Sequence, residues 1–126
     1  MRAKDVTGIV GEEIAAEYLS RQGHQILERR WRGARGELDL ITRDGAQLVA
    51  VEVKTRRGSG YGHPFEAISG PKLARLHRLL LEYCAGQHCL HAQRRVDVVA
   101  VVLGGASAAH SAEHLIRGLE HLKDVS

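Results

Sequence analysis

Residues 36–55, GELDLITRDGAQLVAVEVKT, decide the fold, because two apolar segments here flank the dipeptide Asp44-Gly45. Asp-Gly between alternating apolar residues is one of the strongest short signals for a two-residue hairpin turn. The stretch therefore predicts an antiparallel hairpin, with Asp44 and Gly45 as the loop and with strands over residues 37–43 and 47–56.

The charged side chains of this hairpin are expected to share one face. Side chains alternate across a strand, so Glu52 and Lys54 project together while the intervening valines cover the other face. With the predicted loop, Asp39 pairs with Ala50 and lies diagonally from Glu52, whereas a loop of one more residue would reverse its face. Ionised groups on such an apolar strand are costly unless they are paired or bind a metal.

Asp39 and Glu52 are candidate ligands of a divalent cation. Diagonal neighbours lie about 7–8 Å apart between backbones, so their carboxylates can converge on one ion. Oxygen ligands favour Mg²⁺ or Mn²⁺, which leave further positions to water and a substrate phosphate. Such a metal polarises the phosphoryl oxygen and activates a water, and Lys54 is placed to orient that water and to stabilise charge on the phosphate. The trio predicts hydrolysis of phosphodiester bonds.

A further carboxylate comes from the expected first helix. Apolar residues recur at helical spacing over residues 7–21, and Glu12 falls on the stripe that faces the sheet. Glu12 is therefore a candidate direct or water-mediated metal ligand. A satisfied structural carboxylate is the alternative.

The remaining elements complete a mixed sheet flanked by helices. We expect a short strand over residues 25–32, a second helix that begins near Pro71 and a β-branched strand over residues 96–103. A closing helix is predicted from the spacing of Leu115, Ile116, Leu119 and Leu122. The order α-β-β-β-α-β-α indicates an α/β sandwich that forms a single domain over residues 1–126.

The composition is typical of a soluble globular domain, with 44% hydrophobic and 26% charged residues. No stretch approaches the roughly 18–20 apolar residues that a membrane span requires, and no apolar signal segment follows the N-terminus. Two cysteines, Cys84 and Cys89, are too few for a disulfide scaffold. We therefore expect a cytoplasmic protein in which both thiols are free.

The basic residues are unevenly placed in a chain of formal charge +3 and isoelectric point near 9.1. Their clusters favour binding of a polyanion. The candidate nucleic-acid contacts are Arg32, Arg35, Arg56, Arg57 and Lys72. Charge clusters are more often solvated surface, and that alternative stays open.

Two other patterns are discounted. Zinc sites need paired ligand spacing, which is missing from the cluster Cys84, His88, Cys89 and His91. The glycines within residues 58–62 are not followed by the Gly-Lys-Ser/Thr of a phosphate-binding loop. We expect a mobile loop there that borders the catalytic strand.

Several short motifs resemble the signature of the bacterial YraN family. In this chain they are Gly11-Glu12, Ala15-Ala16, Tyr18-Leu19, Trp31-Arg32, residues 36–41 and residues 51–56. The YraN family is similar to archaeal Holliday junction resolvases and to the PD-(D/E)XK nuclease superfamily. The resemblance covers about residues 8–102.

The resemblance implies a role for each candidate residue. Asp39 stands for the motif aspartate of the superfamily, Glu52 and Lys54 for its E-x-K pair, and Glu12 for its first-helix glutamate. Leu38 stands where the superfamily often has proline, which removes no ligand. The resemblance also implies a restriction-endonuclease-like core of one helix, three meandering strands, a second helix and a further strand.

Three functions are compatible with these patterns. The leading hypothesis is a Mg²⁺- or Mn²⁺-dependent endonuclease that acts on DNA, extended by analogy to branched DNA, where two symmetric cuts would call for a C2 homodimer. The second is a nucleic-acid-binding module that has the same fold and no hydrolytic activity. The third, an adaptor that acts through protein contacts, predicts no salt-dependent affinity for DNA.

Overall fold

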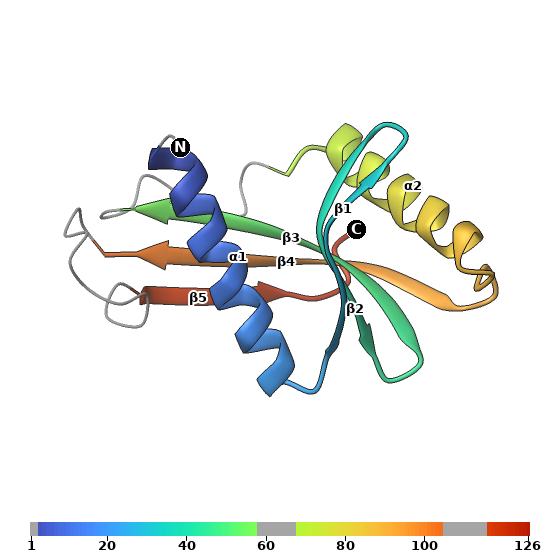
Figure 1. Ribbon diagram of the computed structural model, residues 1–126, viewed down its shortest axis with the longest axis horizontal. Coiled ribbons are helices and arrows are strands. Elements are labelled where there is room, and N and C mark those ends of the chain that lie inside the picture. The colour runs from blue at the N-terminus through green and yellow to red at the C-terminus, as the bar shows by residue number, and fades with distance from the viewer. Residues whose placement is uncertain (1–2, 58–67, 105–115) are drawn as a thin grey trace.

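The computed structural model describes residues 3–57, 68–104 and 116–126, with side chains from residue 6 onward (Figure 1). Its elements, in chain order, are α1 (Ala3–Arg21), β1 (Gln25–Gly33), β2 (Gly36–Asp44), β3 (Gln47–Arg57), α2 (Gly70–Gly86), β4 (Gln93–Leu103) and β5 (Ile116–Leu122).

The strands form one mixed sheet in the order β1-β2-β3-β4-β5. The first three strands are an antiparallel meander, β4 lies parallel to β3, and β5 is antiparallel to β4. A parallel pair needs a crossover connection, and α2 lies within the one between β3 and β4. The predicted α/β class and the order helix, meander, helix, strand are confirmed.

Residues 116–122 form a strand, so the closing helix predicted there is wrong. Ile116, Leu119 and Leu122 do recur at helical spacing, but β5 pairs with the edge of β4 that β3 leaves open. β4 is almost wholly buried, and unpaired backbone groups in such a strand would be costly. Tertiary pairing therefore outweighs local spacing here. Leu115 lies outside the described residues.

The hairpin loop is shifted by one residue from its predicted position. Asp44 pairs with Gln47, so Gly45 and Ala46 form the two-residue loop in place of Asp44 and Gly45. Gly45 has a φ of 61°, a left-handed conformation that glycine adopts without strain. Because the loop keeps two residues, the distribution of β3 side chains between the two faces is unchanged.

The two helices cover opposite faces of the sheet (Figure 1). Val49 and Val51 pack in the apolar cluster under α1, whereas Leu48 and Ala50 pack in the cluster under α2. This alternation agrees with the prediction for β3. Neither helix of the described chain combines the length and the apolar character that a membrane span needs.

α1 makes its closest approach to β3 at Gly11. A Cβ atom at this position would lie 1.8 Å from Oγ1 of Thr55, so the contact excludes any side chain. Nearby, Nε of Arg57 donates a hydrogen bond of 2.8 Å to Oγ1 of Thr7. The first half of α1, including Glu12, is thereby held against the last residues of β3.

Candidate functional site

β1 and β2 are both irregular at one level of the sheet. The pairing of Arg29 with Leu40 brings the next residues, Arg30 and Asp39, to the same level. Arg30 has a φ of 51°, which residues other than glycine rarely adopt. Leu38 packs in the cluster under α2 but Leu40 in the cluster under α1, so the alternation of faces along β2 is interrupted at Asp39.

Asp39 lies where β2 separates from β3. Beyond the last paired residues of the two strands, Oδ2 of Asp39 accepts a hydrogen bond of 2.8 Å from the backbone amide of Val53. Ala50 pairs with Ile41, so its predicted pairing with Asp39 is wrong. Continuing the observed register by one residue sets Asp39 opposite Glu52 and not diagonal to it.

The pKa of Asp39 is raised because the residue is buried and lies close to Glu52. Burial raises the pKa of Asp39 to about 8, and the hydrogen bond and charge of Glu52 act in the same direction. The amide of Val53 opposes the rise, while the charge of Glu12 adds to it. The negative charge of Glu52 thus disfavours ionisation of Asp39, and a cation between the two carboxyl groups would relieve this repulsion.

Glu52 is nearly buried and pairs with a residue of α2. Its Oε2 lies 2.5 Å from Nζ of Lys72, in the first turn of a helix that the Ser69 side chain caps. Lys54 is half-buried on the same strand; burial lowers its pKa, the charge of Lys72 lowers it further, and Glu52 opposes the change. The structure therefore brings Glu52, Lys54 and Lys72 together.

Glu12 reaches the same region from α1. Its Oε1 lies 2.8 Å from Nε of Arg30, and its charge contributes to the raised pKa of Asp39. The left-handed backbone at Arg30 accompanies this ion pair, and no sequence pattern marks that conformation. Glu12 is thus close to the predicted ligands while one of its oxygens is engaged by Arg30.

The donor set fits a cation that takes few ligands from protein. In the described parts of the chain, no three His, Cys, Asp or Glu side chains are close enough to hold one ion. Mg²⁺ commonly binds through one or two carboxylates and completes its coordination with water and phosphate. Asp39 and Glu52 match that pattern as a pair, and Glu12, whose Oε1 is engaged by Arg30, stays a candidate direct or water-mediated ligand.

Three of the predicted nucleic-acid contacts are near this site. Lys72 contacts Glu52 directly, as described above. Arg56 and Arg57 are exposed at the end of β3, two and three residues beyond Lys54. The expected glycine-rich loop that follows them lies outside the described residues.

The other two predicted contacts lie at the turn between β1 and β2. Arg32 and Arg35 are exposed there, and Arg32 pairs with Glu37 at 3.2 Å. The backbone amide of Ala34, in the same turn, donates hydrogen bonds of 2.9 and 3.1 Å to the carboxylate of Glu82. Glu82 is roughly three helical turns from Lys72, so this arginine pair belongs to a different part of the surface.

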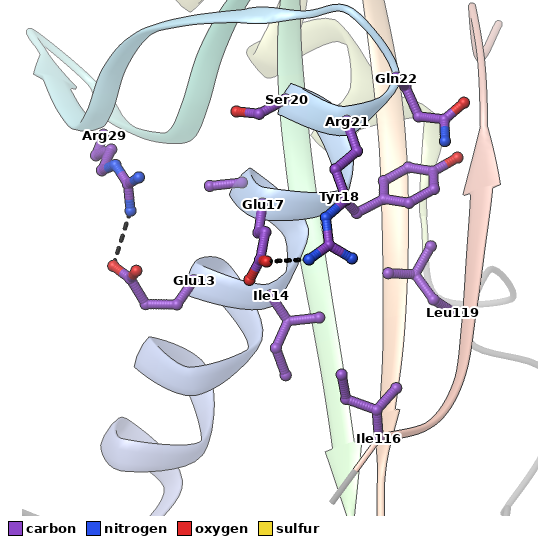
Figure 2. Close-up of a pocket in the computed structure, with 11 residues that line it drawn as sticks. Glu13, Ile14, Glu17, Tyr18, Ser20, Arg21, Gln22, Arg29, Ile116 and Leu119 are labelled. Atoms are coloured by element: carbon purple, nitrogen blue, oxygen red, sulfur yellow. Dashed lines mark hydrogen bonds and ion pairs between the residues drawn. The ribbon is translucent and has the colours of Figure 1, made fainter. Parts of the chain in front are cut away.

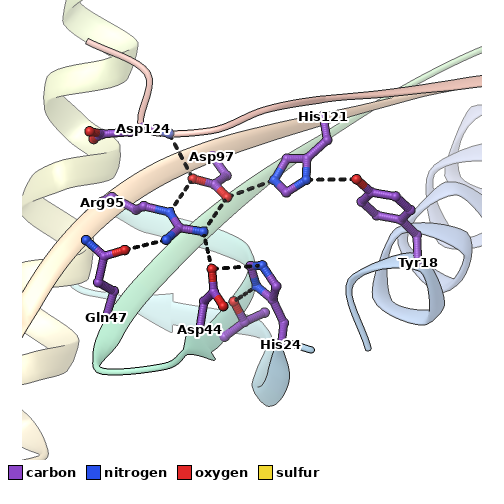
Figure 3. A network of polar contacts seen from close by, with 9 residues as sticks. Tyr18, His24, Asp44, Gln47, Arg95, Asp97, His121 and Asp124 are labelled. Carbon is purple, nitrogen blue, oxygen red and sulfur yellow. Dashed lines mark hydrogen bonds and ion pairs between the residues drawn. The ribbon is translucent and has the colours of Figure 1, made fainter. Parts of the chain in front are cut away.

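A buried polar network lies among β4, β5 and α1 (Figure 3). Asp97 is fully buried and accepts hydrogen bonds from Arg95 and from the backbone amide of Asp124. His121 lies 2.8 Å from Asp97 through Nε2 and 3.0 Å from the Tyr18 hydroxyl through Nδ1. Burial tends to raise the pKa of Asp97, but the hydrogen bonds outweigh it and lower the pKa below the ordinary value.

Arg95 extends the network to the β2–β3 hairpin. It donates to Oε1 of Gln47 and, at 2.9 Å, to Oδ2 of Asp44. The buried His24 ring lies 2.7 Å from Oγ1 of Thr42 through Nδ1 and 3.6 Å from Asp44 through Nε2. Every member of the network has a partner, so we assign it to stability.

A pocket of about 600 Å³ lies between α1 and β5 (Figure 2). Ile14, Ile116 and Leu119 provide its apolar lining. The ion pairs on its walls are Glu13–Arg29 and Glu17–Arg21. None of the four predicted catalytic residues lines this pocket, and its charged groups neutralise one another, so it is not the candidate site.

The cysteines are free, as predicted. Cys84 is buried and Cys89 is partly buried. Burial, followed by the hydrogen bond with Cys89, raises the pKa of Cys84 to about 11. Cys84 is therefore a packing residue and not a reactive thiolate.

Comparison with known proteins places the chain among many relatives. A family model described as "Uncharacterised protein family UPF0102" matches residues 11–101. A UPF0102 protein of Arthrobacter sp. (strain FB24) is 52% identical over 125 residues, which cover 99% of both chains. A UPF0102 protein of Beutenbergia cavernae is 51% identical over 126 residues, which cover 99% of this chain and 99% of the relative. A UPF0102 protein of Rhodococcus opacus is 42% identical over 118 residues, which cover 94% of this chain and 93% of the relative.

Proposed function

The chain belongs to the UPF0102 family, and we propose that it is a divalent-metal-dependent nuclease that hydrolyses phosphodiester bonds, with DNA as its substrate. One observation carries the proposal. Asp39 and Glu52 lie at the same level where β2 separates from β3, and burial, together with the hydrogen bond and charge of Glu52, raises the pKa of Asp39. Such a pair is costly in a partly buried site and suits a cation that takes two protein carboxylates.

The contacts of each carboxylate leave room for that ion. Asp39 uses Oδ2 for the Val53 amide and Glu52 uses Oε2 for Lys72, and the hydrogen bond between the two carboxyl groups is the contact that an ion would replace. The Val53 hydrogen bond orients Asp39 without using its other oxygen. When bound by these two groups, Mg²⁺ or Mn²⁺ supplies neutralisation of phosphate charge and a more acidic water.

The basic residues supply the other requirements of hydrolysis. Burial lowers the pKa of Lys54, which makes its amine a better proton acceptor, and we propose that it orients the attacking water or takes a proton from it. Arg56 and Arg57 are exposed at the end of the same strand and would contact the phosphate backbone of the substrate. Glu12 would act through Arg30 or through a water. We further propose that the substrate is branched DNA and that a C2 homodimer makes two symmetric cuts in it.

A cleavage assay tests the proposal. End-labelled linear, flapped and four-way DNA, and an RNA of the same sequence, are incubated with Mg²⁺ or Mn²⁺ and purified protein. We expect metal-dependent products that chelation abolishes. Asp39→Asn, Glu52→Gln and Lys54→Met should each reduce the rate by at least about 100-fold, the scale of a lost metal ligand or proton-transfer group.

The matched control is a carboxylate outside the site. Glu13 adjoins Glu12 on α1 but pairs with Arg29 at an exposed position, so Glu13→Gln should retain the wild-type rate. Cleavage that persists in Asp39→Asn would point to a contaminating nuclease and would contradict the proposal.

A nucleic-acid-binding module without activity is the second candidate. The observation that favours it is the occupation of the site by internal partners, because Glu52 is bonded by Lys72 and Glu12 by Arg30. This candidate predicts salt-dependent binding of DNA by Arg56 and Arg57 and no product with either metal. The cleavage assay, run beside a binding titration, separates the two candidates.

A further inference from the structure

We infer that Lys72 is a built-in counter-ion that competes with the divalent cation for Glu52 and so sets the affinity of the metal site, a role that rests on the proposed function. Nζ of Lys72 lies 2.5 Å from Oε2 of Glu52, a group whose side chain is 9% exposed. A charge-assisted contact of this length to a nearly buried carboxylate is among the stronger hydrogen bonds in proteins.

The position of Lys72 in its helix makes the contact specific. Ser69 caps α2, Pro71 follows in the first turn, and the next residue is Lys72. A cation is disfavoured at this end of a helix because the first turn carries the positive end of the helix dipole, and the first turn of α2 contains no acidic residue to compensate. Glu52, from another element, supplies the negative charge that this turn lacks.

The start of α2 is also fixed relative to the sheet. Leu73, in the first turn, packs against the buried cluster that contains Leu76 and Leu79, so the start of the helix is anchored by packing. Lys72 therefore reaches Glu52 from a rigid base. The side chain itself remains 33% exposed, which leaves the ammonium group a way out toward solvent.

Competition follows from the shared oxygen and the shared charge. An ion that takes both oxygens of Glu52 must displace the ammonium group, and an ion that takes one must tolerate a positive charge beside it. A displaced ammonium group would be free to bind a phosphate, in which case binding of metal and of phosphate would favour each other. Lys54 affects Glu52 through its charge.

A Mn²⁺ titration without nucleic acid tests this role. Free Mn²⁺ is measured by electron paramagnetic resonance with wild type, Lys72→Met, Lys54→Met and Asp39→Asn. We expect Lys72→Met to bind Mn²⁺ roughly tenfold more tightly, as expected for loss of a charge-assisted competitor. Lys54→Met, which removes an equal charge nearby, should change the affinity about threefold or less.

The outcomes separate the two proposals. Equal affinities of wild type and Lys72→Met, or equal gains in the two lysine variants, would overturn the role of Lys72 while leaving the metal site in place. Binding by wild type that Asp39→Asn does not weaken would overturn the metal site, and the role of Lys72 with it. Lys72→Arg keeps the charge and should stay within about threefold of wild type; should Lys72→Met fold poorly, Lys72→Gln replaces it.

Discussion

At the scale of single residues, the candidate site keeps charges where the fold alone would favour apolar groups. Asp39 and Glu52 approach each other at the edge of the core, and Glu52 is only 8% exposed. Lys72 and the Val53 amide offset part of the cost. This residual cost is what the proposed metal site predicts, because functional groups often reduce the stability of a fold.

Replacing Asp39 by asparagine should therefore stabilise the protein. The asparagine side chain would keep an oxygen for the Val53 amide, and the change would remove one of two neighbouring negative charges. We expect the free energy of unfolding at pH 8 to rise by roughly 1 kcal/mol, measured by urea denaturation without divalent metal. Glu13→Gln, at an exposed position, should shift it by less than about 0.5 kcal/mol. A loss of stability in Asp39→Asn would show that the two carboxylates do not repel.

The members of the site were more predictable than their contacts. Asp39, Glu52 and Lys54 could be predicted because ionised side chains inside apolar segments are costly unless they are paired or bind a metal. The residues that contact these side chains could not be predicted from the sequence. Lys72 was expected to contact nucleic acid, and its approach to Glu52 depends on how α2 packs on the sheet. Asp97 carries the same signal, a carboxylate between valines, and its structural role emerges only with Arg95 and β5 in place.

At the scale of elements, the position of α1 on β3 depends on Gly11. The added methyl group of Gly11→Ala would overlap the Thr55 side chain. We expect this variant to lose about 2 kcal/mol or more of stability, together with any metal-dependent activity, since Glu12 would move with the helix. Thermal unfolding and the cleavage assay provide the two measurements.

Gly8 in the same helix is the matched control. A Cβ atom at Gly8 would meet no atom within 4 Å, so Gly8→Ala should gain about 0.5–1 kcal/mol through helix propensity. A rescue by Thr55→Gly in the Gly11→Ala background would locate the effect at this contact. Equal behaviour of the two alanine variants would contradict the packing described for α1.

Predictability also varied among elements. Strong periodicity or turn chemistry sufficed for α1, the hairpin and α2, although the hairpin loop moved by one residue because Asp44 pairs with Gln47. Residues 116–122 have a spacing that suits either a helix or a strand, and the edge of β4 determined which formed. The periodicity of residues 116–122 gives no information about the open edge of β4, because β4 and β5 come together only in the folded chain.

At the scale of the whole molecule, the buried network of Figure 3 should control stability in mild acid. Burial lowers the pKa of His24 below its ordinary value of 6.5; the charges of Arg95 and His121 act in the same direction, and Asp44 and Asp97 oppose them. The native state thus binds this proton less readily than the unfolded chain. The stabilisation that comes from the lowered pKa of His24 is fully present above pH 6.5 and is lost as the pH falls toward the pKa of His24 in the native state.

We therefore expect the free energy of unfolding to decline as the pH falls from 7 to 5. His24→Gln removes the titrating group and should flatten this decline, although the loss of the ring contacts with Thr42 should lower stability throughout. His77→Gln, at an exposed position of α2, should keep the wild-type slope. Urea denaturation across a pH series provides the measurement, and an unchanged slope in His24→Gln would exclude His24 as the source.

The most direct test of the central claim, that Asp39 and Glu52 form a metal site, is anomalous diffraction from crystals soaked in Mn²⁺. We predict one strong anomalous peak between the two carboxylates, about 2–2.5 Å from an oxygen of each, with Lys72 turned away from Glu52. Data that show no peak there, with Lys72 still bonded to Glu52 at saturating Mn²⁺, would contradict the claim.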